Sequence, residues 1–242
     1  MPGRPTHETC RARRDRDRSE AGAISPDRFA DRVHAGQVLA GHLKGYRGRP
    51  GIVVLGLPRG GVPVAAEVAR SLEAPLDVFV VRKLGVPGRE ELAMGAIASG
   101  GVRVVNDEVV RRLGIPEEVV ASVARREEEE LRRREEAYRG GRAPLDIAGR
   151  TVILVDDGLA TGSTMRAAIA AVCQKGPEAV VVAVPTAAAP TLPTLHAEAD
   201  DVVAAMVPEP FAAVGNSYVD FSQTSDDEVR GLVLSSGAVD GG

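Results

Sequence analysis

The sequence predicts an α/β protein built on a doubly wound, mainly parallel sheet. Short apolar runs rich in β-branched residues alternate with segments of helical periodicity between residues 50 and 206. Two of these runs pass directly into glycine-rich turns that open a helix. Because parallel strands are joined by right-handed crossovers, helices should cover both faces of the sheet. Ligands of such sheets bind beyond the carboxyl ends of the strands, so we expect the functional residues there.

The composition indicates a globular protein with a substantial core. The chain has 242 residues, of which 44% are hydrophobic and only 3% aromatic, so the core must consist mainly of Val, Ala, Leu and Ile. Its 30 basic and 34 acidic residues give a net charge of −4, which does not favour nucleic acid as a partner. No apolar run is long enough to span a membrane, and no hydrophobic signal segment opens the chain. We therefore expect a cytoplasmic protein without a membrane partner.

The two ends of the chain are predicted to be disordered. Residues 1–22 are rich in Arg with interspersed acids, a composition that cannot bury a core, and residues 233–242 end in the run SSGAVDGG, which is mostly small. Residues 23–232 then form one domain. A helix is expected to begin after Ser25, with Pro26 in its first turn and Phe29 in its apolar stripe, and to end near Lys44. We assign no chemistry to it.

A first strand–loop–helix unit follows. Residues 52–55 form a short buried strand, the sequence GLPRGG occupies residues 56–61, and a helix continues with Pro63 in its first turn. A loop with three glycines around Arg59 can turn backbone N–H groups and a guanidinium toward an anion. On its own, the pattern is equally typical of a tight structural turn.

The next segment combines a strand with a long glycine-rich stretch. Residues 77–81 are predicted to be a strand that ends in Arg82-Lys83. Residues 84–101 are only partly periodic and favour a functional loop over packed structure. Residues 102–105 return as a strand. Asn106 and Asp107 then cap a short helix that ends near Leu113.

A long polar helix is predicted from Pro116 to about Arg139. Acids stand at its start and Arg-Gly at its end, in the order that the helix dipole favours. Its glutamates and arginines recur at a spacing of four residues, in the pairs Glu128/Arg132, Glu129/Arg133 and Glu130/Arg134. Such pairs stabilise a solvent-exposed helix, so the polarity of this segment does not require a ligand.

The most informative stretch is TVILVDDGLATGSTMR at residues 151–166. An apolar strand ends in Asp156 and Asp157, and a hydroxyl-rich glycine turn opens a helix. The unpaired N–H groups of a helix N-terminus suit a phosphate, whereas two carboxylates suit sugar hydroxyls or a hydrated magnesium ion. The simpler alternative is a turn whose hydroxyls only cap the helix and whose aspartates are solvated. Further strands are expected at residues 179–184 and 201–206.

The run VILVDDGLATGST resembles the phosphoribosyl diphosphate (PRPP) motif of type I phosphoribosyltransferases. The resemblance implies that Asp156 and Asp157 bind the ribose hydroxyls. It also implies that a turn we call the phosphate turn cradles the 5′-phosphate, through Ala160, Thr161, Gly162, Ser163 and Thr164. Gly158 departs from the family pattern, which usually has an aliphatic residue there. Ala160 stands where 6-oxopurine enzymes have an aspartate, which counts against a hypoxanthine or guanine enzyme.

The same resemblance assigns roles elsewhere in the chain. A segment we call the diphosphate loop would hold diphosphate, through Pro58, Arg59, Gly60 and Gly61; in relatives this loop often contains a strained or cis peptide. Residues 83–105 would form a mobile flap that excludes water, with Lys83 contacting diphosphate. Residues 207–230 would form a small C-terminal hood. There Phe211 and Tyr218 are tentative acceptor-binding residues, although packing is an equally good interpretation of each ring.

The implied reaction is transfer of the 5-phosphoribosyl group from PRPP to a nitrogen acceptor, a nucleobase or related heterocycle, with release of diphosphate. Mg²⁺ would bind with PRPP near Asp156 and Asp157. Catalytic roles fall on Arg59, Lys83, Asp156 and Asp157, no general base is assigned, and the family resemblance implies a homodimer. The alternative is a non-catalytic PRPP sensor or RNA-binding regulator on the same fold.

Overall fold

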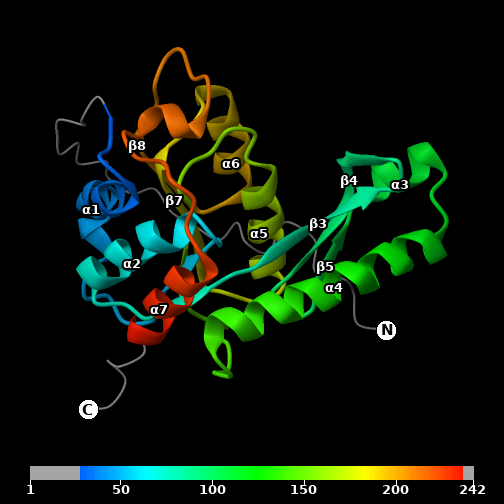
Figure 1. Ribbon diagram of the computed structural model, residues 1–242, viewed down its shortest axis with the longest axis horizontal. Helices are drawn as coiled ribbons and strands as arrows, with labels where there is room; N and C mark the ends of the chain where they lie inside the picture. The colour runs from blue at the N-terminus through cyan, green and yellow to red at the C-terminus, as the bar shows by residue number, and fades with distance from the viewer. Residues whose placement is uncertain (1–27, 237–242) are drawn as a thin grey trace.

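The computed structural model describes residues 28–236 and shows an α/β body from which an arm projects (Figure 1). The five strands of the body run parallel in the order β2-β1-β6-β7-β8. They are β1 (Ile52–Gly56), β2 (Leu76–Val78), β6 (Thr151–Val155), β7 (Ala179–Thr186) and β8 (Asp201–Met206). The predicted doubly wound parallel sheet is confirmed. The tail expected at residues 1–22 lies outside the described residues.

Helices cover both faces of this sheet. On one face lie α1 (Arg32–His42) and α2 (Gly61–Leu72), and on the other α5 (Ser163–Cys173) and α6 (Leu192–Glu198) (Figure 1). Successive strand residues point to opposite faces of the sheet and pack into a hydrophobic core on each face. Ile153 faces α1 and α2, whereas Leu154 faces α5. Burial on both faces explains why the strands are continuous β-branched runs rather than alternating patterns. No helix within residues 28–236 is long and apolar enough to cross a lipid bilayer.

Helix α1 begins later than expected. Its first residue is Arg32 and its N-cap is Asp31, whose carboxylate accepts from the His34 N–H at 2.8 Å. Phe29 is not helical, because its backbone pairs with the hood: its N–H donates to Ser217 O at 2.8 Å. The predicted cap Ser25 lies outside the described residues. A short 3-10 turn, η2 (Lys44–Tyr46), follows α1 where the helix was predicted to end.

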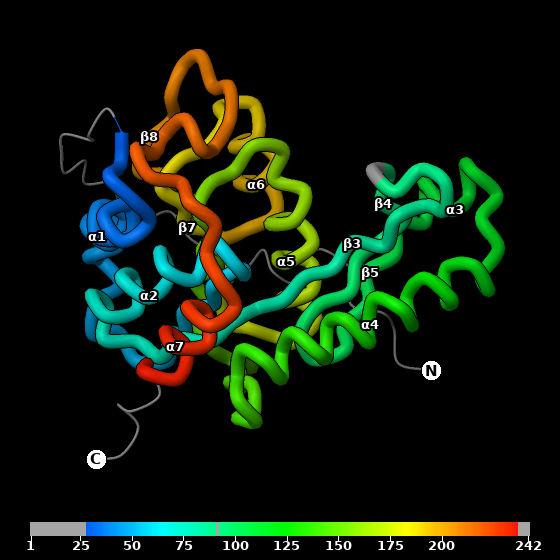
Figure 2. The backbone as a smooth tube through the Cα atoms, in the orientation of Figure 1, coloured from blue at the N-terminus to red at the C-terminus, as the bar shows by residue number. Residues whose placement is uncertain are grey.

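The flap is an ordered antiparallel sheet, not a loop. Its strands are β3 (Val81–Val86), β4 (Arg89–Ala98) and β5 (Val102–Val105), and Figure 2 shows them extending away from the body. The prediction of an irregular stretch at residues 84–101 is therefore wrong. Its glycines allow close strand contact, since a Cβ on Gly95 would lie 2.5 Å from the Val104 carbonyl oxygen. The preceding strand β2 ends at Val78, so Lys83 belongs to β3.

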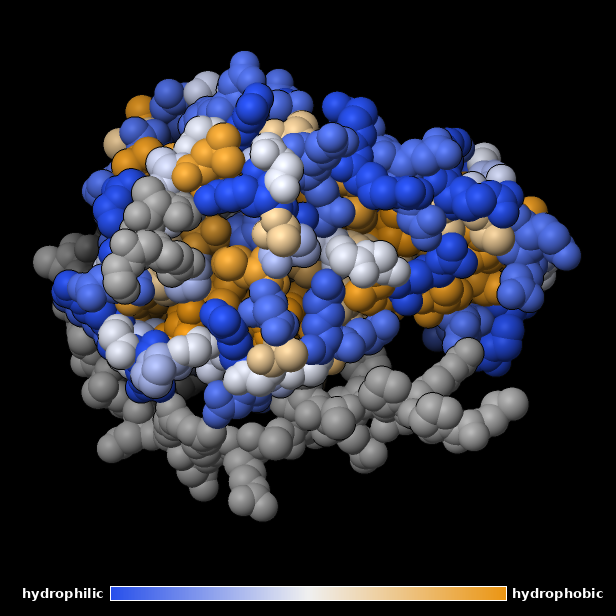
Figure 3. All heavy atoms as spheres, turned by 90° about the horizontal axis from the view of Figure 1, so that it is seen from below, coloured by the Kyte–Doolittle hydropathy of each residue, from blue (hydrophilic) through white to orange (hydrophobic). Residues whose placement is uncertain are grey.

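Two helices complete the arm. They are α3 (Asp107–Leu113), capped by Asn106, and α4 (Glu117–Arg139), which packs along the flap sheet (Figure 2). Of the three predicted pairs, the structure contains Glu130–Arg134, at 2.7 Å, whereas Glu128 pairs with Arg103 of β5 at 3.4 Å. Hydrophilic side chains cover much of the arm on the face shown in Figure 3. Helix α4 is therefore amphipathic and packs on the flap with its apolar side.

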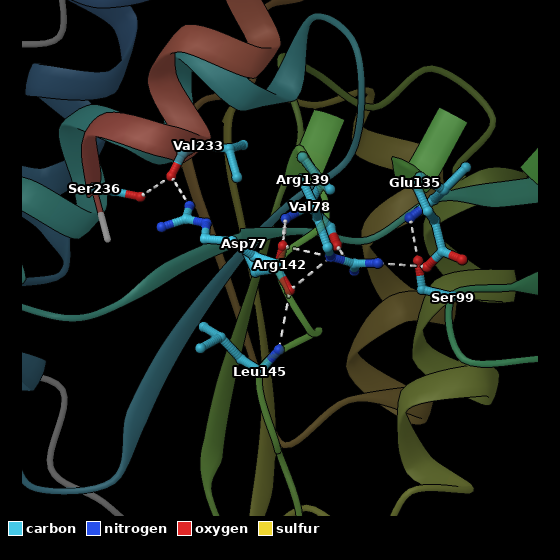
Figure 4. A network of polar contacts seen from close by, with 10 residues as sticks. Asp77, Val78, Ser99, Glu135, Arg139, Arg142, Leu145, Val233 and Ser236 are labelled. Atoms are coloured by element: carbon cyan, nitrogen blue, oxygen red, sulfur yellow. Dashed lines mark hydrogen bonds and ion pairs between the residues drawn. The ribbon is translucent and has the colours of Figure 1, made fainter. Parts of the chain in front are cut away.

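A buried ion pair attaches the base of α4 to β2 (Figure 4). The Arg139 Nε donates to both carboxylate oxygens of Asp77, at 2.9 and 3.1 Å, and each residue is 5% exposed. Arg139 also donates to Glu135 and to the Val78 carbonyl. Asp77 accepts in addition from the backbone N–H groups of Val78 and Leu145. Every polar group of this network therefore has partners, as burial requires.

The chain ends in the hood and a final helix. Short 3-10 turns, η3 (Ala189–Thr191) and η4 (Val214–Ser217), precede α7 (Asp226–Ser236), which packs against α2 and α4. Ser225 caps this helix, because its Oγ accepts from the Glu228 N–H at 3.1 Å. The helix continues past residue 232, where we expected a tail, because Val233 is buried one turn after Val229. Residues 237–242 lie outside the described residues.

Candidate functional site

The two predicted loops meet at one end of the sheet. Strands β1 and β6 are parallel neighbours, and Gly56 pairs with Val155. The loops that follow the two strands therefore begin side by side at the same edge of the sheet. A Cβ on Gly60 would lie 1.9 Å from Asp157 Oδ2, and one on Gly61 would lie 2.8 Å from the Asp156 Cα. Only glycine permits this approach. The diphosphate loop and the acidic pair, far apart in sequence, therefore form one site, and the Pro58–Arg59 peptide within it is cis.

The acidic pair is held in an environment that disfavours its negative charge. Burial, together with the neighbouring charge of Asp157, raises the pKa of Asp156 well above its usual range. Burial also raises the pKa of Asp157, although the Arg32 guanidinium opposes that rise. Asp156 Oδ1 accepts the Asp157 N–H at 2.9 Å. Hydroxyl donors or a cation placed beside the pair would stabilise its negative charge. The site is therefore suited to a polyhydroxylated, metal-bound ligand.

The phosphate turn has the geometry of an anion site. Helix α5 begins at Ser163, and its N-cap is Gly162, which has φ +68° and no side chain with which to cap. Among the residues described, the only backbone N–H of the first turn that donates to a hydroxyl oxygen is that of Ser163, which makes a long bond of 3.5 Å to Thr161 Oγ1. Thr161 and Ser163 are exposed. The alternative in which these hydroxyls only cap the helix is therefore disfavoured, and N–H groups of the first turn face outward for a ligand.

The two predicted cations occupy different positions. Arg59 lies beside the N-terminus of α7, where its Nη1 is 3.7 Å from Asp226 Oδ1. The same oxygen accepts from the Tyr138 hydroxyl at 2.9 Å, and burial together with this bond raises the pKa of Tyr138 to about 12. Lys83 is exposed on flap strand β3, and within residues 28–236 no hydrogen bond or ion pair joins it to the acidic pair or the diphosphate loop. Its role in the site stays a prediction.

Arg32 is a site residue that the sequence analysis missed. Its Nε and Nη2 lie 2.9 and 2.8 Å from Asp157 Oδ2, and its Nη1 donates to the Ser222 carbonyl at 2.6 Å. Its guanidinium carbon lies 4.0 Å from the centroid of the Phe221 ring. No local pattern marked Arg32, because all its partners are distant in sequence and it is simply the first residue of an ordinary helix.

The structure changes the expected roles of the hood aromatics. Tyr218 is 1% exposed, its ring packs against Phe29 and Phe221, and its hydroxyl donates to the Asp157 carbonyl at 2.5 Å. It therefore supports the acidic pair instead of presenting a face to an acceptor. Phe211 is half-buried, and its acceptor-binding role stays a prediction. Phe221 is the more exposed ring, at 38%.

Comparison with known proteins identifies the family. The family described as "Phosphoribosyl transferase domain" matches residues 34–205, most of the described chain. The chain belongs to the type I phosphoribosyltransferase family. It is 50% identical over 201 residues, 83% of its length, to a Mycobacterium tuberculosis (strain H37Rv) protein named "Putative phosphoribosyl transferase Rv0571c", of which it covers 45%. It is 34% identical over 115 residues, 47% of its length, to "Bifunctional protein PyrR" of Roseiflexus, of which it covers 57%.

A solved structure supports the same assignment. The protein TT1426 from Thermus thermophilus is 47% identical, with a TM-score of 0.78 over 86% of this chain and 98% of that structure. The chain spans about half the length of the curated relatives it matches.

The one departure from the phosphoribosyltransferase motif has a packing explanation. A Cβ on Gly158 would lie 2.5 Å from Val214 Cγ1 and 2.8 Å from Thr186 Cγ2. The side chain of Val214, from the hood, therefore occupies the space that a side chain at position 158 would need. The glycine thus allows the hood to pack against this motif.

Proposed function

We propose that this protein binds PRPP with Mg²⁺ and transfers the 5-phosphoribosyl group to a ring nitrogen of a nucleobase or related heterocycle, releasing diphosphate. The observation that carries the proposal is the contact between Gly60-Gly61 and the acidic pair. It places a candidate ribose site directly beside a candidate diphosphate site. The phosphate turn at the N-terminus of α5 provides a third subsite for the 5′-phosphate.

The residues fit a magnesium ion that arrives with its ligand. Mg²⁺ is commonly held by one or two carboxylates together with substrate phosphates, and Asp156 and Asp157 offer such a partial set of oxygen donors. When bound, the ion supplies positive charge that offsets the charge of the diphosphate group. The raised pKa of the pair is consistent with a site whose anions are stabilised by the ligand.

The chain's own residues would act by positioning and electrostatics. Asp156 and Asp157 orient the ribose, and the phosphate turn fixes its far end, so C1 is presented to the acceptor. As the bond from C1 to diphosphate breaks, negative charge grows on the leaving group. Arg59 and Lys83 stabilise that charge. The flap sheet excludes water from the electron-poor ribose carbon. A nucleophilic ring nitrogen needs no general base from the protein.

Calorimetric titration of PRPP with MgCl₂ tests the proposal. We expect saturable binding to the wild type and none to a folded Asp156→Asn/Asp157→Asn double variant, because both ribose-binding carboxylates are gone. Asp146→Asn, an exposed aspartate away from the site, is the matched control. Absence of binding by folded wild type would refute the proposal. Binding without diphosphate release across a panel of bases would instead favour the PRPP-sensing alternative.

Asp226→Asn is expected to strengthen diphosphate binding about two- to fivefold, because an ion pair of this exposure contributes roughly 0.2–1 kcal/mol. Arg59 would no longer share its charge with a carboxylate 3.7 Å away. Titration of magnesium diphosphate measures the change. Asp227→Asn, in the same exposed helix turn, removes an equal charge without an ion partner among the described residues and should alter affinity less. Equal effects of the two variants would show that only net charge matters.

A further inference from the structure

Arg32 joins three parts of the site that are separate in sequence. Two of its nitrogens contact the Asp157 carboxylate, a third donates to the Ser222 carbonyl of the hood, and its flat face lies over Phe221. Its Nε would also lie 3.0 Å from a Cβ on Gly60, so the guanidinium borders the diphosphate loop. The Arg32 side chain is 12% exposed and that of Asp157 is 17% exposed. A cation is thus enclosed where the ribose, diphosphate and hood segments converge.

The guanidinium is suited to this place in a way that a lysine is not. Its planar fork satisfies a carboxylate and a carbonyl at once, and its face stacks on an aromatic ring. Within residues 28–236, Arg32 provides the one ion pair to Asp157. Because both contacts to Asp157 come from one rigid guanidinium, Arg32 can fix the direction in which this carboxylate points.

We propose that Arg32 is a positioning residue of the PRPP site: it fixes the orientation of the Asp157 carboxylate and ties it to the hood. The inference rests on the proposed function, because it concerns the same ribose-binding carboxylate. Arg32 does not contact the transferred group in this role. It acts through Asp157, and through Ser222 and Phe221 it makes the geometry of the ribose site depend on that of the hood.

The test compares magnesium–PRPP affinity in wild type, Arg32→Gln and Arg32→Lys, with Arg47→Gln as the control. Arg47 pairs with Glu73 on the surface, where both side chains are 64% exposed. We expect Arg32→Gln to bind PRPP roughly tenfold more weakly. Arg32→Lys should recover only part of this loss, because the charge returns but the fork that contacts Asp157 and Ser222 together does not. Affinity for magnesium diphosphate, which has no ribose, should change less than affinity for PRPP.

A purely structural role for Arg32 would lower the Tm without changing the affinity of the folded protein for PRPP. Unchanged affinity in folded Arg32→Gln would overturn the inference while leaving the proposed function intact, whereas a wild type that binds no PRPP would overturn both. If Arg32→Gln does not fold, Arg32→Lys decides the matter, since full affinity in that variant would contradict the positioning role. Equal losses of affinity for magnesium diphosphate and for PRPP would also overturn the inference, because Arg32 would then not act through the ribose-binding carboxylate.

Discussion

Asp156→Asn is expected to raise the melting temperature of the free protein while weakening magnesium–PRPP binding roughly 10- to 100-fold. The affinity loss corresponds to about 1.5–3 kcal/mol for hydrogen bonds that involve a charged group. The gain in stability follows because burial and the neighbouring Asp157 oppose the charge of Asp156 in the folded state. Asparagine keeps an oxygen that can accept the Asp157 N–H, so the local backbone hydrogen bond is retained. Thermal unfolding and calorimetry measure the two effects.

The sign of the pH dependence provides a check. A carboxyl whose pKa is higher in the folded than in the unfolded state binds its proton more tightly when folded, so it destabilises the folded protein above that pKa. The destabilisation begins to shrink as pH falls through the folded pKa of Asp156, and it is gone below the unfolded pKa. The Tm advantage of Asp156→Asn should therefore be largest at neutral pH and should shrink on acidification. A constant difference in Tm across this range would contradict the assigned charge penalty.

Asp157→Asn serves as the matched contrast, because it removes one carboxylate from the same pair. It also deprives the largely buried Arg32 of its ion partner. This variant should therefore lose affinity like Asp156→Asn but should lack its gain in Tm. If both variants were stabilised equally, the Arg32 contact would contribute nothing to the folded state.

Arg139→Ala is expected to reduce the free energy of unfolding by about 3–5 kcal/mol, because it leaves the Asp77 carboxylate buried without its counter-ion. For a chain of this size the corresponding fall in Tm is roughly 6–20 °C. Helix α4 would lose its attachment to β2, and with it the base of the flap arm (Figure 4). Chemical denaturation followed by circular dichroism measures the loss.

Two further variants separate this ion pair from other effects. Arg133→Ala removes an arginine from the same helix, but one whose partner Glu130 is on the solvent side, so stability should change little. The double variant Asp77→Asn/Arg139→Met should be less destabilised than Arg139→Ala, because no buried charge is left unpaired. If the double variant were the less stable protein, the ion pair would have to be favourable in itself.

The sequence by itself determined the parts of this protein whose signals are local. The run VILVDDGLATGST specified a strand, an acidic pair and a turn into a helix, and the structure places these at β6 and α5. Continuous β-branched runs predicted a sheet buried on both faces, because each strand residue is buried whichever way it points. The glycine loop around Arg59 could be located, but whether it served a site or only a turn was undecided until its contact with Asp156 and Asp157 was known.

Only the tertiary structure decided the features that depend on distant partners. The glycines of residues 84–101 resembled loop signals, yet Gly95 lies in strand β4. A glycine is needed there because a carbonyl of the neighbouring strand lies too close for a side chain. Phe29, which was predicted to be helical, lies outside the helix because its backbone pairs with the hood. Arg32 became part of the site, and Tyr218 part of the core, through contacts with residues far along the chain. Such contacts leave no periodicity or spacing in the sequence, because they arise only when the folded backbone brings the segments together.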